Sequence, residues 1–355
     1  MTNSTPPQPT AEFYRSLPKV DLHRHLEGSL RFETVRELAR SQGLDLPPTG
    51  ELRSMVQIQE TEPLTFENFL SKFTTLRLFY RSSEIITRIT QEAVTDAAAD
   101  NVRYLELRFT PVALSKAEGF PLAQVMDWVI DGAQQAEKTS GVMTRLIASI
   151  NRHESVALAA QVSYLASERI EQGIVGLDLA GNEAEFSAAP FCEIFKAARE
   201  RGLHITVHAG EWGDAQNVVQ AIEQLQAERI GHGVRVLESP DAIMVARQAN
   251  IPFEVCITSN YQSGAIPLIN QHPLKRMLLN NLNVTINTDD PSISQITLGN
   301  EYRLACEDLD LSLKHLRERV IAAGRAAFLP DNEKYKLIRA LEEEFTACMS
   351  GFGPG

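Results

Sequence analysis

The sequence holds a set of histidines and carboxylates whose types suit a divalent metal and proton transfer. The set comprises His23, His25, His208, Glu211, His232, Asp289 and Asp290. Imidazole and carboxylate are good zinc ligands, and a catalytic zinc keeps one position open for water. Because zinc lowers the pKa of that water towards about 7, it supplies a hydroxide nucleophile at neutral pH. The residue types therefore favour a metal-dependent hydrolase, and they leave its substrate open.

The spacing of these residues supports a shared site. His23 and His25 are two residues apart, so both imidazoles lie on one face of an extended strand while Arg24 faces away. Singly, the other candidates also have ordinary explanations, such as a hydrogen-bonded core histidine for His208 or a helix cap for Glu211. Four strand ends that all carry histidines or carboxylates are harder to explain in that way. We therefore interpret them as one site.

Short apolar runs, each followed by polar residues, predict eight strands. The expected strands cover residues 19–25, 102–109, 145–151, 174–182, 204–208, 229–232, 252–258 and 284–289. Helical patterns fill most of the gaps, and alternation of strands with helices indicates a parallel sheet. Eight such units fit an α/β fold of the (β/α)8 TIM-barrel type, in which chemistry sits at the carboxyl ends of the strands. A doubly wound open sheet is the alternative.

The gap between the first two strands is too long for one helix. Helices are expected over residues 31–42, 66–76 and 84–99. Residues 43–61 contain Pro47, Pro48 and Gly50 and are expected to form a loop. This segment predicts a helical insertion, at about residues 30–100, over one mouth of the barrel.

We expect one domain. It would span residues 13–349, with closing helices near 311–323 and 333–345. Residues 1–12 and 350–355 are expected to be flexible tails.

Composition excludes several classes of protein. The 355 residues include 34 Lys and Arg against 46 Asp and Glu, a net charge of −12, which argues against non-specific binding of nucleic acid. A run of about 18 apolar residues is absent, so a membrane span is not expected. The four cysteines are far apart, and the first residues do not resemble a secretory signal, so we expect a cytoplasmic protein.

Several motifs together resemble the adenosine deaminase family. They are residues 18–28 (PKVDLHRHLEG), 176–183 (GLDLAGNE), 208–211 (HAGE), 229–233 (RIGHG), 259–265 (SNYQSGA) and 288–291 (TDDP). They occur in the family's order from residue 18 to about 302, so the resemblance covers most of the chain. It implies a (β/α)8 enzyme that hydrolyses the C–N bond of a cyclic amidine.

The resemblance also implies a role for each site residue. One zinc per chain would be held by His23, His25, His208 and Asp289. Glu211 would protonate purine N1 while a metal-activated water attacks C6, and His232 would act as general base or electrostatic support. Asp290 would bind the substrate near N7 and help to orient the nucleophile. The backbone of Gly181 would contact the base near N3, with His25 also beside the substrate and Glu27 on its sugar side.

The implied reaction converts adenosine, with 2′-deoxyadenosine as a further substrate, to inosine and ammonia in purine salvage. Adenine, aminodeoxyfutalosine and N6-methyl-AMP are the substrates of sibling deaminases. Glu27 stands where many adenosine deaminases have Asp, whereas adenine deaminases often carry Glu there. A hydrolase of a cyclic amide or ester, and a non-catalytic purine-binding protein, are the alternatives of other classes. The oligomeric state is left open.

The remaining histidines and aromatic residues have structural interpretations. We expect His204 to fill the barrel interior and His272, which precedes a proline, to start a helix. His153 and His315 are interpreted as solvated. An aromatic stripe, Phe66, Phe69, Phe73 and Phe79, is expected either to pack the insertion or to form a wall over the substrate.

Overall fold

Eight parallel strands form the centre of the computed structural model, which describes residues 9–44 and 47–350. The strands are β1 (Lys19–His25), β2 (Val102–Phe109), β3 (Met143–Asn151), β4 (Ile174–Ala180), β5 (His204–Ala209), β6 (Arg229–His232), β7 (Pro252–Val255) and β8 (Asn283–Ile286). They pair in sequence order from β1 to β8. The (β/α)8 architecture is confirmed, and the doubly wound sheet is excluded by this order.

The barrel closes between β1 and the segment that follows β8. The backbone N–H of His25 donates to the carbonyl of Asp289 (2.8 Å), and that of Asp289 donates to the carbonyl of His23 (2.7 Å). Further down β1, the N–H of Leu22 donates to the side-chain oxygen of Asn287 (2.9 Å). The closure therefore ties two candidate metal ligands on β1 directly to a third after β8.

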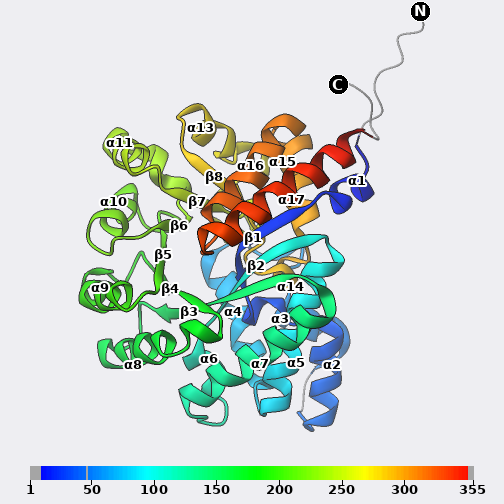
Figure 1. Ribbon diagram of the computed structural model, residues 1–355. Coiled ribbons are helices and arrows are strands. Elements are labelled where there is room, and N and C mark those ends of the chain that lie inside the picture. Colours follow the sequence, from blue (N-terminus) through cyan, green and yellow to red (C-terminus); the bar gives the residue numbers. More distant parts are fainter. Residues whose placement is uncertain (1–8, 45–46, 351–355) are drawn as a thin grey trace, which may run out of the picture.

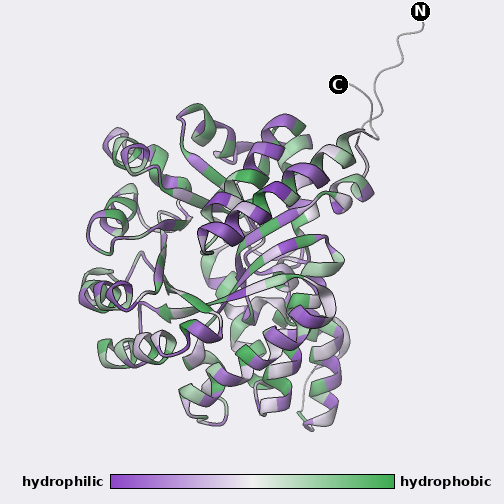
Figure 2. Ribbon diagram, in the orientation of Figure 1, coloured by the Kyte–Doolittle hydropathy of each residue, from purple (hydrophilic) through white to green (hydrophobic). Residues whose placement is uncertain are grey.

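Helices surround the strands, as Figure 1 shows. Between the strands they are α6 (Pro111–Ser115), α7 (Leu122–Ser140), α8 (Val156–Ser167), α9 (Cys192–Glu200), α10 (Ala215–Glu223), α11 (Pro240–Ala249), α12 (Ile257–Gln262) and α13 (Leu274–Leu279). Their inward faces are apolar: on α9, for example, Ile194, Phe195 and Ala198 are buried. Figure 2 shows green and purple residues mixed along these outer helices, as expected for one buried and one solvated face.

The insertion after β1 contains one more helix than expected. It comprises α2 (Phe32–Ser41), α3 (Thr49–Val56), α4 (Phe66–Leu76) and α5 (Ser83–Ala99). Our expectation of a loop over residues 43–61 is wrong at α3. The two prolines precede that helix rather than interrupt it, and Pro48 occupies the N-cap position, where its lack of an N–H does no harm.

Three strands end earlier than expected. We expected β4 to reach residue 182, β7 residue 258 and β8 residue 289, but they end at Ala180, Val255 and Ile286. After β7 the chain turns directly into α12, which begins at Ile257. In each case residues of the candidate site occupy the segment after the strand, where they can turn towards the barrel axis.

The ends of the described chain are helical. α1 (Ala11–Ser16) begins inside the expected tail 1–12, because the side chain of Thr10 caps it by accepting from Phe13 N–H. After β8 come α14 (Pro291–Ser294), α15 (Leu298–Glu307), α16 (Leu313–Ala326) and α17 (Asp331–Ser350). The other residues assigned to the tails, 1–8 and 351–355, lie outside the described residues. Within residues 9–44 and 47–350, no helix combines the length and apolarity of a membrane span.

Candidate active site

Four side chains converge at the carboxyl ends of β1 and β5 and after β8. They are His23, His25, His208 and Asp289, and the candidate ligand atoms of all four lie within 4.8 Å of one another. The Asp289 Oδ1 atom is 3.2 Å from His23 Nε2 and 3.3 Å from His25 Nε2. His23 Nε2 is buried and has no hydrogen-bond partner among the described residues. A donor set of three imidazoles and one carboxylate, with a buried nitrogen left free, fits a single divalent cation.

Carboxylates behind the histidines fix which ring nitrogen faces the centre. His23 Nδ1 donates to Glu254 (2.9 Å), and His208 Nδ1 donates to Asp178 (2.9 Å). Both carboxylates are ionised partners of Arg108, which lies 2.8 Å from Glu254 and 3.5 Å from Asp178. With the proton held at Nδ1, each Nε2 presents a lone pair to the centre, as metal-ligating histidines require.

Two residues of the site hold an unusual backbone conformation. His232 has a φ of 58° and Asp289 a φ of 69°, both in the left-handed region that side chains other than glycine rarely adopt. Such strain persists where surrounding contacts over-determine the conformation, and it gathers at functional sites. His232 holds this conformation at the last residue of β6, and Asp289 holds it three residues after β8 ends.

Glu211 is held in the loop after β5 by another glutamate. The Glu183 carboxylate accepts backbone N–H groups of Gly210 (2.8 Å), Glu211 (2.6 Å) and Trp212 (2.8 Å). The Glu211 side chain is buried, and its Oε2 is 3.5 Å from His232 Nε2. Burial, reinforced by the negative charges of Asp289 and Glu183, raises the pKa of Glu211 well above its usual range. Burial therefore favours the protonated form of this carboxyl.

Glu27 and Asp290 form the acidic wall beside the cluster. Glu27 follows β1 and accepts the N–H of Thr110 (2.6 Å), and burial raises its pKa to about 7. Asp290 lies beside it, and burial and the negative charge of Asp289 raise the pKa of Asp290 well above its usual range. A cation at the centre would oppose that repulsion.

A pocket opens from the cluster between the strand ends and α4. It is lined on the polar side by the site residues and Gly181, and on the other side by Phe69, Leu70 and Phe73 of α4, with Trp212. Phe66 contacts Trp212 edge-on, with ring centroids 4.1 Å apart, so α4 meets the loop after β5 there. The aromatic stripe thus serves both expected roles: Phe79 is fully buried, whereas Phe69 and Phe73 face the pocket.

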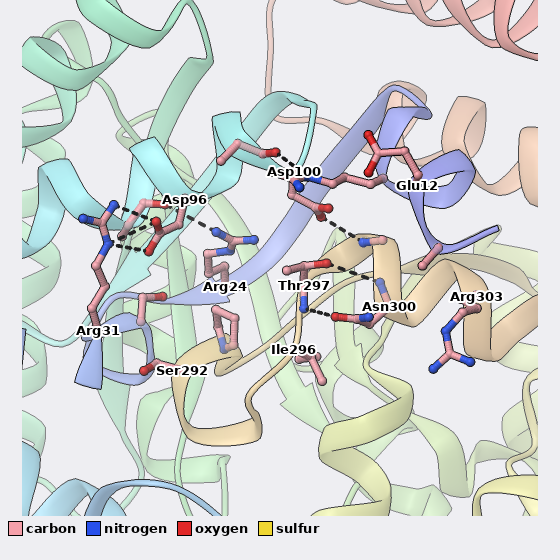
Figure 3. Close-up of a pocket in the computed structure, with 17 residues that line it drawn as sticks. Glu12, Arg24, Arg31, Asp96, Asp100, Ser292, Ile296, Thr297, Asn300 and Arg303 are labelled. Atoms are coloured by element: carbon pink, nitrogen blue, oxygen red, sulfur yellow. Dashed lines mark hydrogen bonds and ion pairs between the residues drawn. The ribbon is translucent and has the colours of Figure 1, made fainter. Parts of the chain in front are cut away.

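Arg24 points away from the cluster, as its place between two ligands predicts. Its guanidinium donates to Asp21 (3.0 Å) and Thr288 (3.2 Å) and lines a separate cavity of about 500 Å³ between β1, α5 and α15 (Figure 3). In that cavity Arg31 forms a two-pronged ion pair with Asp96. The contacts of Arg24 brace the back of β1 against the strand end that carries Asp289.

Other histidines fall outside the cluster. His204 does not fill the barrel interior as expected: its side chain is partly exposed, its Nδ1 donates to the Glu228 carboxylate (2.9 Å), and its ring stacks on Phe328. His315 is exposed on α16 and contacts Ser312. His272 stands at the start of α13, as expected, but it is buried and also contacts Asn260 (3.3 Å).

Sequence reasoning missed the residues that support the site. They are Glu254, Asp178, Asn260, His272, Ser259 and Glu183. Ser259 donates to Asp289 (2.6 Å), although the two are 30 residues apart. His23 and Glu254 are separated by 231 residues. Their positions in the sequence could have revealed two of them. Asp178 and Glu254 lie within predicted strands, before the strand ends that carry the site, and a carboxylate that faces the inside of a barrel needs a partner.

The barrel and the polar cluster at its strand ends together define a class, enzymes of the TIM-barrel type with a set of candidate metal ligands at the carboxyl ends of the strands. The family model described as "Adenosine deaminase" matches residues 18–344. The chain belongs to the adenosine deaminase family, and it is accordingly a hydrolytic deaminase.

Relatives within and around this family share most of the chain. An adenosine deaminase of Erwinia tasmaniensis is 38% identical over 321 residues, which cover 90% of this chain and 96% of the relative. The crystal structure of an adenine deaminase from Arthrobacter aurescens superposes with a TM-score of 0.85 at 28% identity, covering 92% of this chain and 98% of that one. The crystal structure of an Arabidopsis N6-mAMP deaminase superposes with a TM-score of 0.84 at 30% identity, covering 94% of this chain and 99% of that one.

Proposed function

We propose that this enzyme removes the 6-amino group of adenosine by hydrolysis, yielding inosine and ammonia. The observation that carries the proposal is the placement of a buried carboxyl, Glu211, at 3.5 Å from His232 beside a four-donor cation site. Hydrolytic attack on a purine needs a proton donor for the ring nitrogen N1 and a nucleophile that can reach C6. The similarity to an adenosine deaminase at 38% identity selects adenosine among the 6-aminopurines.

The donor set described above fits one zinc ion, held by His23, His25, His208 and Asp289. When bound, zinc supplies a nucleophile at neutral pH by lowering the pKa of a coordinated water. The positive charge also favours the ionised form of the carboxylates around it.

The other side chains of the pocket bind and activate the purine. Protonated Glu211 donates its proton to N1, which makes C6 electrophilic. As the attacking water forms the C6–O bond and the C6–N bond breaks, one of its protons leaves with the amine as ammonia and the other returns to Glu211. Asp290, whose carboxyl pKa is raised by burial, donates a hydrogen bond to N7 at the base edge. Gly181, which lines the pocket with a φ of 91°, offers its backbone to the base near N3. Glu27 stands where β1 gives way to the insertion and contacts the sugar.

Turnover of the purified, zinc-loaded protein tests this proposal. Adenosine, 2′-deoxyadenosine and adenine are compared by ultraviolet absorbance and ammonia release. We expect fast conversion of both nucleosides and slow conversion of adenine. Conversion of adenine alone would show that the protein is an adenine deaminase. An absence of turnover on all 6-aminopurines would overturn the deaminase proposal.

One observation favours a second candidate, a deaminase of 5′-phosphorylated adenosine. Arg77 lines the pocket at the end of α4, and its Nε is buried with no hydrogen-bond partner among the described residues. An unpaired guanidinium near a substrate is the usual partner of a phosphate. The similar Arabidopsis structure is named an N6-mAMP deaminase.

The ratio of kcat/KM for AMP to that for adenosine separates the two candidates. If Arg77 binds phosphate, Arg77→Gln lowers kcat/KM for AMP at least tenfold and leaves adenosine unchanged. Arg81→Gln is the matched control, because Arg81 is a nearby surface arginine that does not line the pocket. Equal kcat/KM values for AMP in Arg77→Gln and wild type would remove this candidate.

A further inference from the structure

A buried histidine outside the catalytic cluster has a fixed protonation pattern. The backbone N–H of Leu274 donates to Nδ1 of His272 (3.1 Å). A backbone N–H can only donate, so this Nδ1 carries no proton and the neutral ring holds its proton at Nε2. Burial alone lowers the pKa of His272 to about 3, so the ring is neutral at any working pH.

The protonated Nε2 of His272 in turn orients the side-chain amide of Asn260. The two atoms His272 Nε2 and Asn260 Oδ1 are 3.3 Å apart, and both side chains are buried. An N–H requires an acceptor, which places the amide oxygen of Asn260 on this side. Its Nδ2 then faces the opposite way, towards His232.

The amide nitrogen of Asn260 lies 3.0 Å from His232 Nδ1. An amide NH₂ group only donates, so His232 Nδ1 accepts, and the neutral ring of His232 carries its proton at Nε2. That Nε2 is the atom that faces the site, at 3.5 Å from Glu211 and 3.9 Å from Asp289. The same Asn260 nitrogen is 3.4 Å from Glu211 Oε1, so one amide contacts both groups.

We propose that His272 and Asn260 are positioning residues that hold His232 as a hydrogen-bond donor at Nε2. This inference rests on the proposed deaminase function. In this form Nε2 has no lone pair for the proton of the nucleophile. His232 therefore orients the nucleophile and stabilises its charge through an N–H, and it is not the general base. The direction of the whole chain of bonds is set by one backbone N–H on α13.

The variant Asn260→Asp reverses the polarity of the relay with almost no change in shape. A carboxylate accepts from both histidines, so His232 moves its proton to Nδ1 and turns a lone pair towards the site. Loss of one preorganised donor lowers kcat by about 10²–10³ in comparable sites. We expect such a loss in kcat with a KM within about twofold, since the apolar walls that bind the purine are untouched.

A spectroscopic readout tests the tautomer independently of turnover. Long-range proton–nitrogen spectra of protein labelled with ¹⁵N-histidine report which ring nitrogen is protonated, and His232→Gln and His272→Gln assign the two signals. We expect Nε2–H for both rings in the wild type, and a switch to Nδ1–H at His232 alone in Asn260→Asp. His315→Gln, on the surface of α16, is the control and leaves both signals unchanged.

Two results would overturn the relay. The first is a wild-type His232 protonated at Nδ1, which needs no variant and so survives a failure of Asn260→Asp to fold. The second is Asn260→Asp with wild-type kcat. Failure of the proposed function looks different: no purine is deaminated by the wild type, while the wild-type spectrum still shows Nε2–H at both rings.

Discussion

At the scale of single residues, the site separates its acids by environment. Glu211 has few compensating donors: Asn260 and Ser263 approach it only at 3.4 Å. Asp289, by contrast, accepts a 2.6 Å bond from Ser259 and lies among histidines, which hold its pKa well below its usual range although burial alone would raise it. The surroundings thus favour the protonated form of Glu211 and the ionised form of Asp289, a division that suits the proposed roles of proton donor and metal ligand.

Glu211→Gln should retain the metal and lose turnover. The amide has the shape of the protonated acid but cannot deliver a proton to N1, and general acid catalysis contributes typically 10²–10⁴-fold. We expect kcat on adenosine to fall by about that factor, with one metal per chain in elemental analysis of both proteins. His208→Ala, run alongside, should lose the metal as well. Unchanged turnover in Glu211→Gln would remove this residue as the acid.

At the scale of elements, the short 3-10 turn after β1, residues Glu27–Ser29, packs against the residues after β8. Gly28 is required there, since a Cβ at this position would lie 1.8 Å from Asp290 Oδ1 and 2.5 Å from its Cβ. The turn and α14 can therefore approach closely only with glycine. This contact sets the position of Asp290 beside the pocket.

Gly28→Ala should impair catalysis more than metal binding. The added methyl displaces Asp290, whose neighbour Asp289 is tied into the barrel closure, and a displacement of about 1 Å lowers rates by about 10²-fold. We expect kcat to fall about 10- to 100-fold with metal content unchanged. Gly50→Ala on α3 is the matched control, because a methyl group there would meet no described atom within 4 Å outside its own helix turn. Equal kcat values in the two variants would contradict the argument.

The limits of the strands and helices show how much of the fold could be predicted from the sequence. The strands β1, β2 and β6 match their expected limits residue for residue. The helix α3 was missed because Pro47 and Pro48 are equally typical of loops and of helix starts. Asn260, His272 and Glu254 were missed for a different reason: their partners lie 12 to 231 residues away, and only the closed barrel brings them into contact.

At the scale of the whole molecule, the barrel depends on one side chain for part of its closure. Asn287 accepts the N–H of Leu22 (2.9 Å) and donates to Thr285 (2.9 Å), and it is fully buried. Asn287→Leu leaves the Leu22 N–H without an acceptor, which costs about 1–3 kcal/mol. Urea unfolding at fixed zinc concentration measures this loss. Asn283→Ala is the control: Asn283 begins β8, its side chain makes no hydrogen bond within the described part of the chain, and its loss should change stability less than Asn287→Leu does.

Stability should also respond to pH through Glu301, which joins α15 to the start of α12. Its buried carboxyl accepts the backbone N–H of Ile257 (2.7 Å), yet burial raises its pKa from 4.5 to about 7. A raised pKa means that the folded state keeps a proton that the unfolded chain releases. Folding is therefore penalised progressively as pH rises from about 4.5 to about 7, by about 3 kcal/mol in all.

Glu301→Gln removes this titration and isolates it from the rest of the protein. The free energy of unfolding of the variant, minus that of the wild type, should rise by about 3 kcal/mol between these pH values. The variant thus becomes the more stable of the two as pH rises, because only the wild type acquires the buried charge. Glu307→Gln, on the exposed side of the same helix, controls for the loss of a charge as such. A difference between Glu301→Gln and wild type that does not change with pH would show that Glu301 remains ionised in the fold, with the N–H donors of α12 outweighing its burial.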